Sequence, residues 1–102
     1  MPVVIARVHP KPGHLQEVLE IYAEAVPLVH QEPGCELFAL HTDQTSIFVV
    51  ERWTTDEDLK VHSATENFAR TRARVQGLLG APADVWVLDA VPAGDPLKGV
   101  LP

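Results

Sequence analysis

The segment CELFALHTDQTSIFVVERW, residues 35–53, holds two runs of apolar and β-branched residues that are separated by a short polar connection. Such runs predict two strands, at 35–42 and 46–53, and the intervening Asp-Gln-Thr predicts the turn of a β-hairpin. An antiparallel pair of strands is therefore the starting point for the fold.

The region upstream of the hairpin predicts a strand followed by a long helix. Residues 3–9 are mostly apolar and β-branched, and a turn rich in proline and glycine ends this strand. Apolar residues then recur at steps of three and four, which predicts a helix from about 13 to 31. Pro27 lacks a backbone donor, so it predicts a kink or a new turn inside this helix.

Two helices and a last strand are predicted downstream of the hairpin. Each helix start carries a capping box, in which a hydroxyl residue is followed three positions later by a glutamate: Thr54 with Glu57, and Ser63 with Glu66. The boxes predict helices at about 55–61 and 64–79, and the apolar run at 85–88 predicts the strand.

The order strand, helix, strand, strand, helices, strand predicts an α+β fold. It is the order of the ferredoxin-like, split βαβ arrangement with a four-stranded antiparallel sheet. The length of 102 residues predicts one domain, over residues 1–91, with an irregular tail at 92–102 that is rich in proline and glycine.

Both faces of the predicted sheet carry apolar side chains. Successive residues of a strand point to opposite faces, and here both members of each pair are apolar: Ile47 and Phe48, Val49 and Val50, Val85 and Trp86, and Val87 and Leu88. The helices of one small domain can cover only one of these faces. A second copy of the chain is the expected cover for the other, so the sequence predicts a homodimer formed through the sheet faces.

Composition argues against several kinds of partner and location. The formal net charge is −6 and the basic residues form no stripe, which argues against binding to nucleic acid or to an anionic membrane. No segment approaches the roughly 20 apolar residues that span a bilayer, and the N-terminal apolar run is too short for a signal peptide. Cys35 is the only cysteine, which fits a reducing compartment. These features predict a cytoplasmic protein.

Neither a metal site nor a cofactor site is predicted. The five histidines show no spacing that is typical of metal ligands, and Cys35 has no second thiol beside it. The glycines form no phosphate-binding loop, which argues against a nucleotide cofactor. The serines lie at a turn and at a predicted helix start rather than in a nucleophile elbow, which argues against a hydrolase triad.

A small group of aromatic residues, together with an arginine, is the candidate lining of a substrate pocket: Tyr22, Phe38, Trp53, Phe68 and Arg72. Packing in the core is the competing explanation for each aromatic ring. Arg72 shares a predicted helix face with Phe68, so it is either a cation at the edge of the core or a partner for substrate.

His62 is the candidate general base. It lies between the two predicted helices downstream of Trp53, at a corner that is expected to lie over the sheet. A solvent-exposed junction residue is the competing explanation. Imidazole titrates near neutral pH, and beside an aromatic pocket it suits the removal of a proton from substrate.

Several motifs together resemble a known family. EPGCELF at 32–38, VERW at 50–53, then His62 and Asn-Phe at 67–68 resemble the antibiotic biosynthesis monooxygenase domain, in its quinol-monooxygenase-like branch of the dimeric α+β barrels. The resemblance covers about residues 2–91. It matches Glu51, Trp53 and His62 to residues of the family pattern, whereas Phe38 stands where the family has a tyrosine.

The resemblance implies a homodimer and a reaction without a bound cofactor. Several members of this type oxidise polycyclic phenols or quinols with molecular oxygen and use no metal, flavin or haem. The implied function is therefore a cofactor-independent monooxygenase acting on a small aromatic substrate, with Glu51 among the substrate-binding residues and with His62 and Arg72 as catalytic residues. Because Phe38 lacks the hydroxyl of the family's tyrosine, a mechanism that needs this hydroxyl is not implied for this chain.

Related branches of the same fold leave two alternatives open. Haem-degrading members carry a tryptophan where this chain has His62 and a histidine near Arg72, so haem degradation is not implied. Another branch isomerises a small phosphorylated signalling-sugar derivative, and its members end in a tail similar to KGVLP at 98–102. A small-molecule isomerase and a non-catalytic dimeric binding protein are therefore the alternatives.

Overall fold

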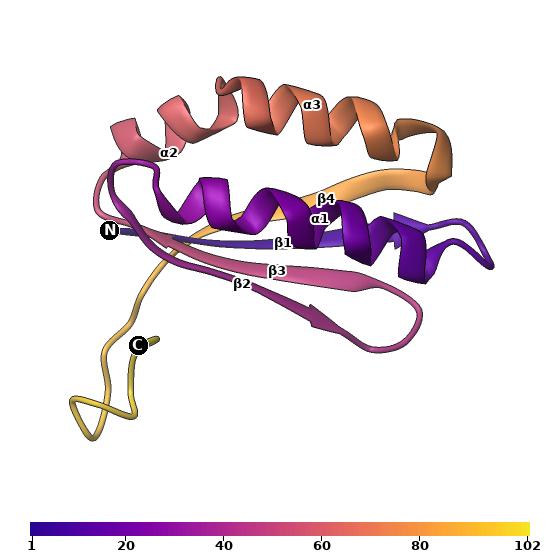
Figure 1. The fold of residues 1–102 in the computed structure, drawn as a ribbon. Coiled ribbons are helices and arrows are strands. Elements are labelled where there is room, and N and C mark those ends of the chain that lie inside the picture. Colours follow the sequence, from indigo (N-terminus) through magenta and orange to yellow (C-terminus); the bar gives the residue numbers. More distant parts are fainter.

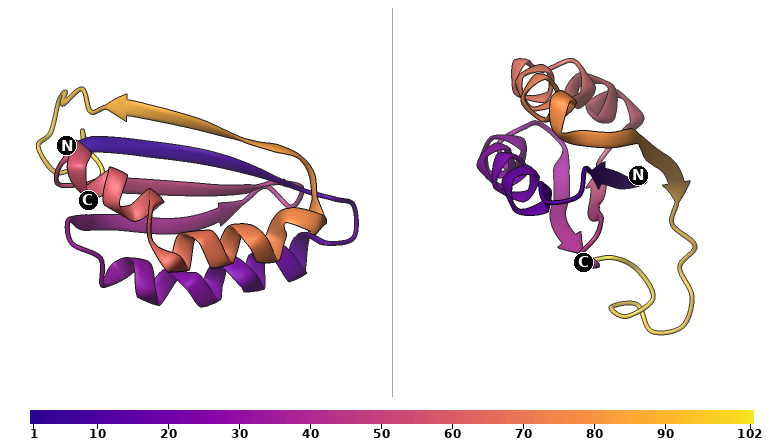
Figure 2. Two further views of the ribbon diagram at one scale, coloured as in Figure 1. Left: turned by 90° about the horizontal axis from the view of Figure 1, so that it is seen from above. Right: turned by 90° about the vertical axis from the view of Figure 1, so that its right-hand side faces the viewer.

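The structure is a computed structural model that describes residues 1–102. Its elements, in chain order, are β1 (Pro2–Pro10), α1 (Leu15–His30), β2 (Cys35–Thr42), β3 (Ile47–Trp53), α2 (Asp56–Ser63), α3 (Glu66–Val75), the short 3₁₀ helix η1 (Gln76–Leu78) and β4 (Leu79–Asp89). The strands form one antiparallel sheet in the order β2-β3-β1-β4. All helices lie on the same face of this sheet (Figures 1 and 2). The predicted ferredoxin-like α+β fold is confirmed.

The helix α1 differs from its prediction at Pro27. It is continuous from Leu15 to His30, so the predicted new turn is wrong. Pro27 lies in the last turn and its side chain is exposed, so the missing backbone donor affects only one hydrogen bond close to the helix end.

The starts of α2 and α3 also differ from their predictions. The side chains that cap them are Thr55, which accepts a hydrogen bond from the backbone of Asp58, and Thr65, which accepts one from the backbone of Phe68. The predicted capping boxes at Thr54 and Ser63 are therefore wrong. The reason for the second is that α2 extends through Ser63, whose hydroxyl donates to a carbonyl one turn back.

Strand β4 is longer than the sequence predicted. It begins at Leu79, because α3 ends at Val75 and a single turn of 3₁₀ helix follows. Pro82 lies inside it without breaking it, since β4 is an edge strand that pairs only with β1. The predicted helix to residue 79 and the predicted strand at 85–88 are corrected accordingly.

The core fills the space between the helices and one face of the sheet. Two buried clusters form it, one around Trp53 and Phe38 and the other around Ile47 and Val18. The predicted alternation along β3 is confirmed, because Ile47 and Val49 are buried there while Phe48 and Val50 point away from the helices.

The opposite face of the sheet, here called the outer face, carries no helix. It presents Ile5, Phe48, Val50, Trp86 and Leu88. Trp86 and Leu88 are 47% and 42% exposed. The tail at 90–102 forms no helix or strand and returns beneath this face (Figure 1), where Arg52 donates a hydrogen bond to the carbonyl of Leu101. None of the helices has the length and apolar character that crossing a membrane requires.

Candidate active site

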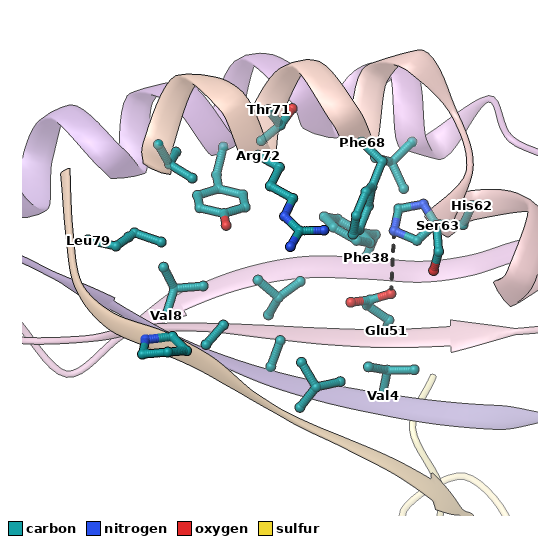
Figure 3. A pocket seen from close by; sticks show the side chains of 18 of the residues that line it. Val4, Val8, Phe38, Glu51, His62, Ser63, Phe68, Thr71, Arg72 and Leu79 are labelled. Carbon is teal, nitrogen blue, oxygen red and sulfur yellow. Dashed lines mark ion pairs between the residues drawn. The ribbon is translucent and has the colours of Figure 1, made fainter. Parts of the chain in front are cut away.

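A cavity of about 1140 Å³ lies between the sheet and the helices α2 and α3 (Figure 3). Its floor is formed by apolar residues of β1, β3 and β4 that point toward the helices: Val4, Ala6, Val8, Val49, Val85 and Val87. Its roof is formed largely by α3, through Phe68, Thr71, Arg72 and Val75. The cavity therefore has an apolar body into which a few polar groups project.

His62 lies at one end of this cavity in the last turn of α2 and is only 5% exposed. Its ring centroid is 4.7 Å from that of Trp53, 5.3 Å from that of Phe68 and 5.7 Å from that of Phe38. The prediction that this side chain lies over the sheet beside aromatic rings is confirmed. The alternative of a solvent-exposed junction residue is wrong.

Two carboxylates face the two nitrogens of the His62 ring. Nδ1 lies 2.8 Å from Oε1 of Glu32, and Nε2 lies 4.0 Å from Oε1 of Glu51 (Figure 3 shows the second contact). The indole Nε1–H of Trp53 donates a hydrogen bond of 3.0 Å to the same oxygen of Glu51. His62 thus sits in a buried network that reaches the cavity through Nε2 and Glu51.

Burial controls the ionisation of the groups around His62. Desolvation raises the pKa of Glu51, and the hydrogen bond from Trp53 and the nearby His62 offset this only in part. Burial, followed by the charges of Glu32 and Glu51, also raises the pKa of the Cys35 thiol. Cys35 therefore stays protonated, which is the wrong state for a nucleophile or a metal ligand.

Tyr22 and Arg72 are two further polar residues that line the cavity. Tyr22 comes from α1, and burial raises the pKa of its hydroxyl, so it remains a neutral hydrogen-bond donor. Tyr22 therefore supplies the cavity with a phenol hydroxyl, which Phe38 does not have. Arg72 extends from α3 toward the sheet (Figure 3). Arg52 and Arg74 each pair with a glutamate, whereas Arg72 has no carboxylate partner.

The structure brings together all the residues that the sequence nominated. Six of them line the cavity, and one lies behind its wall. Those that line it are Tyr22, Phe38, Glu51, His62, Phe68 and Arg72. Trp53 has no exposed surface and lies behind the wall, where it contacts Glu51 and His62.

Glu32 is the residue of this network that sequence reasoning missed. Its position in EPGCELF indicated only the end of a helix, because no spacing rule connects position 32 with position 62. Among the residues of the chain, no group of three or more histidine, cysteine, aspartate or glutamate side chains has the arrangement of a metal site.

Comparison with known proteins places this geometry in a family. The family profile described as "Antibiotic biosynthesis monooxygenase" matches residues 1–74. The Escherichia coli K12 protein YgiN, described as a probable quinol monooxygenase, is 31% identical over 90 residues, which cover 76% of this chain and 86% of YgiN.

Solved structures agree with the sequence comparison. A crystal structure of an antibiotic biosynthesis monooxygenase is 34% identical in sequence and superposes with a TM-score of 0.83. The match covers 90% of this chain and 100% of that chain. Rv0793 from Mycobacterium tuberculosis is 26% identical and also gives a TM-score of 0.83. The match covers 93% of this chain and 100% of Rv0793. The match over residues 1–74 and the identity to YgiN lead to one conclusion: this chain belongs to the antibiotic biosynthesis monooxygenase family.

Proposed function

We propose that this chain is a monooxygenase that oxidises a small, electron-rich aromatic quinol or phenol with molecular oxygen, and that His62 removes the first proton. The observation that carries the proposal is the position of His62, which lines a largely apolar cavity, directs Nε2 toward the cavity residue Glu51 and is surrounded by three aromatic rings. Family membership and the description of YgiN as a probable quinol monooxygenase support the same reaction class.

The shape and polarity of the cavity suit a flat aromatic substrate. Aliphatic side chains of the sheet form one wall, and the rings of Phe38 and Phe68 offer faces and edges for contact with a substrate ring. The polar groups lie at separate places: His62 contacts Trp53 and Phe38 of one core cluster, whereas Tyr22 packs against the cluster around Ile47 and Val18. A ring with oxygen substituents at two positions would therefore satisfy both polar regions.

The proposed reaction starts with proton transfer. Nε2 of His62 takes the proton from a substrate hydroxyl, which leaves an electron-rich phenolate. The phenolate reduces O2 by one electron, and the resulting substrate radical and superoxide combine to form a peroxide on the ring. Breakage of the O–O bond leaves one oxygen atom on the ring and releases the other as water, so a quinol and O2 give a hydroxyquinone and H2O.

Each polar residue has a defined part in this proposal. Burial raises the pKa of Glu51, so this carboxyl keeps its proton to higher pH than an exposed glutamate, and in its protonated form it can donate a hydrogen bond to a substrate oxygen near His62. Trp53 holds Glu51 through its indole N–H and supports the imidazole ring from behind. Arg72 and Tyr22 stabilise negative charge on the second oxygen substituent. We propose that these residues act without a metal, flavin or haem.

We also propose that the chain works as a homodimer whose outer faces pack together. The support is the row of apolar side chains on that face, which no helix covers, including Trp86 and Leu88 with 47% and 42% of their surface exposed. Large exposed apolar patches of this kind are typical of interfaces. A small-molecule substrate and O2 are the other proposed partners.

A second candidate function is isomerisation of a small phosphorylated sugar derivative. The observation that favours it is Arg72, a cavity-lining cation that no carboxylate neutralises. His62 would again remove a proton, but the resulting enolate would be reprotonated at another carbon rather than react with oxygen. A non-catalytic dimer that only binds such a ligand is the third candidate.

An oxygen-electrode screen separates these candidates. Protein stripped of metal is incubated with a series of quinols, phenols and anthrones, and O2 uptake is recorded with product masses. A monooxygenase gives stoichiometric O2 uptake and a product that contains one added oxygen atom. Binding by calorimetry with no O2 uptake and no product from any compound would contradict the proposal and favour a binding protein. A phosphorylated sugar derivative is included in the same series, and its rearrangement without O2 uptake would favour the isomerase.

A further inference from the structure

Glu32 is a mostly buried carboxylate that contacts the candidate base but does not line the cavity. Its side chain is only 11% exposed, and Oε1 lies 2.8 Å from Nδ1 of His62, whose side chain is 6% exposed. The cavity wall includes His62 but not Glu32. A direct contact with substrate is therefore not the function of this carboxylate.

The backbone around Glu32 holds the carboxylate in place. It lies in the turn between α1 and β2, where Gly34 adopts a positive φ of 75° that favours glycine. The carbonyl of Gly34 accepts a hydrogen bond of 2.9 Å from the backbone of Thr54 at the end of β3, which ties the turn to the sheet. The side chain of Asp58 in α2 fills the space where a Cβ at position 34 would lie. The turn is thus packed against the same helix that carries His62.

The contact with Glu32 decides which nitrogen of His62 carries a hydrogen. An ionised carboxylate can only accept a hydrogen bond, so Nδ1 must be the protonated nitrogen. The lone pair of the neutral ring is then on Nε2, the nitrogen on the side of Glu51. The three aromatic neighbours hold the ring by packing, but an apolar contact cannot select one tautomer over the other.

We propose that Glu32 is a positioning residue that keeps neutral His62 in its Nδ1–H tautomer, so that Nε2 is the basic nitrogen presented to the cavity. The same contact stabilises the imidazolium that forms when Nε2 takes a proton, since the pair then becomes a charge-assisted hydrogen bond. This proposal rests on the proposed role of His62 as the base. It assigns a function to the first residue of the EPGCELF segment that does not depend on contact with substrate.

The test measures the tautomer directly. Protein labelled with ¹⁵N-histidine is studied by two-bond ¹H–¹⁵N NMR at alkaline pH, where histidine is neutral, and the signals of His62 are assigned by their loss in His62→Asn. In the wild type, His62 should show a protonated Nδ1 and an unprotonated Nε2. In Glu32→Met, which has a similar volume but no strong acceptor, the population should shift toward the Nε2–H tautomer.

A second carboxylate–histidine pair of the same chain provides the matched control. On the surface, Nδ1 of His14 lies 3.1 Å from Oε1 of Glu17, where both side chains are largely exposed. Glu17→Gln should leave the His62 signals and the activity unchanged. A wild-type His62 that carries its hydrogen on Nε2 would overturn the proposal, even if Glu32→Met does not fold. So would an unchanged Nδ1–H tautomer in folded Glu32→Met.

Kinetics add a reading that a purely structural role would not produce. With a substrate from the oxygen screen, Glu32→Met should lower kcat by between about tenfold and 10⁴-fold, as expected when a base loses its orienting carboxylate. KM should stay within about twofold, because Glu32 does not line the cavity. A raised KM with unchanged kcat would contradict the proposal. If no compound is oxidised, the monooxygenase proposal fails, while the NMR result still decides the role of Glu32.

Discussion

The indole nitrogen of Trp53 donates a 3.0 Å hydrogen bond to Oε1 of Glu51, two residues earlier on the same strand and on the same face of the sheet. This contact gives a buried carboxyl group one donor, but burial still raises the pKa of Glu51. The native state therefore holds the proton of Glu51 at pH values where the unfolded chain has released it. Stability accordingly falls as the pH rises through the window between the two pKa values.

Glu51→Gln should remove this pH-dependent loss of stability, because the amide cannot ionise and can still accept the hydrogen bond from Trp53. The free energy of unfolding of the variant, relative to the wild type, should be higher at pH 7 than at pH 4. Urea denaturation at the two pH values measures it. If the difference in unfolding free energy between variant and wild type were the same at pH 4 and pH 7, it would contradict a raised pKa of Glu51.

Asp43 provides a control of opposite sign for that experiment. Backbone hydrogen bonds from Ser46 and Thr45 lower the pKa of Asp43, so its contribution to stability is present at neutral pH and is lost as the pH falls through its folded-state pKa. Asp43→Asn should therefore be less stable than the wild type at pH 7, and the difference should shrink at low pH. If the stability of Asp43→Asn relative to the wild type changed with pH in the same direction as that of Glu51→Gln, the pH response would not be specific to these carboxyl groups.

Substitution of His62 should separate its catalytic role from its structural role. His62→Ala leaves the mostly buried Glu32 without its partner, which costs about 1–3 kcal/mol of stability. His62→Asn keeps a hydrogen-bond donor for Glu32 and should lose less stability. Both variants should lower kcat by roughly 10²–10⁴-fold, because neither side chain can take up a proton. Activity of folded His62→Asn within tenfold of the wild type would exclude His62 as the base.

Arg72 should contribute to substrate binding. Arg72→Gln removes the cation from the cavity and should raise KM by about tenfold or more for a substrate with an acidic or phenolic substituent, the loss expected for a charge-assisted hydrogen bond. Arg70→Gln is the matched control, because Arg70 lies on the same helix but does not line the cavity. Equal effects of the two substitutions would indicate a general change in charge rather than a contact with substrate.

The outer face of the sheet should form the dimer interface. Light scattering should show a dimer for the wild type, with an interface that buries more than roughly 2,000 Å² in total. Trp86→Glu places a charge in the centre of the apolar row and should shift the protein to the monomer. Leu28→Glu, at a residue of α1 with a similar exposure of 45% against 47% for Trp86, should leave the dimer intact. A wild-type monomer at micromolar concentration would contradict the proposed assembly.

The helix caps allow a direct test of the corrected helix starts. Thr55→Ala and Thr65→Ala should each lower the free energy of unfolding by about 1 kcal/mol, since each hydroxyl accepts from a free backbone amide of the first turn. Thr54→Ala and Ser63→Ala, at the positions that the sequence pattern nominated, should have smaller effects. Thermal or urea denaturation of the four variants measures the order.

Local sequence patterns were sufficient for the fold. Alternation along β3 and the three- and four-residue steps of α1 reflect the geometry of the backbone itself, so they indicate element types and their order without knowledge of contacts. The same alternation indicated a second apolar face of the sheet. The segment from Trp53 to His62 nominated the imidazole as a candidate base but left open whether it faces solvent, and only the packed structure shows it beside three aromatic rings.

Tertiary structure decided what depends on residues far apart in the chain. The length of β4 depends on its pairing with β1, and the position of Trp53 behind the cavity wall depends on packing from both layers. The contact between Glu32 and His62 joins positions thirty residues apart, and a single glycine with a positive φ in the intervening turn helps to set it. No periodicity records such a contact, because its energy comes from burial and hydrogen bonding that exist only after the layers have packed.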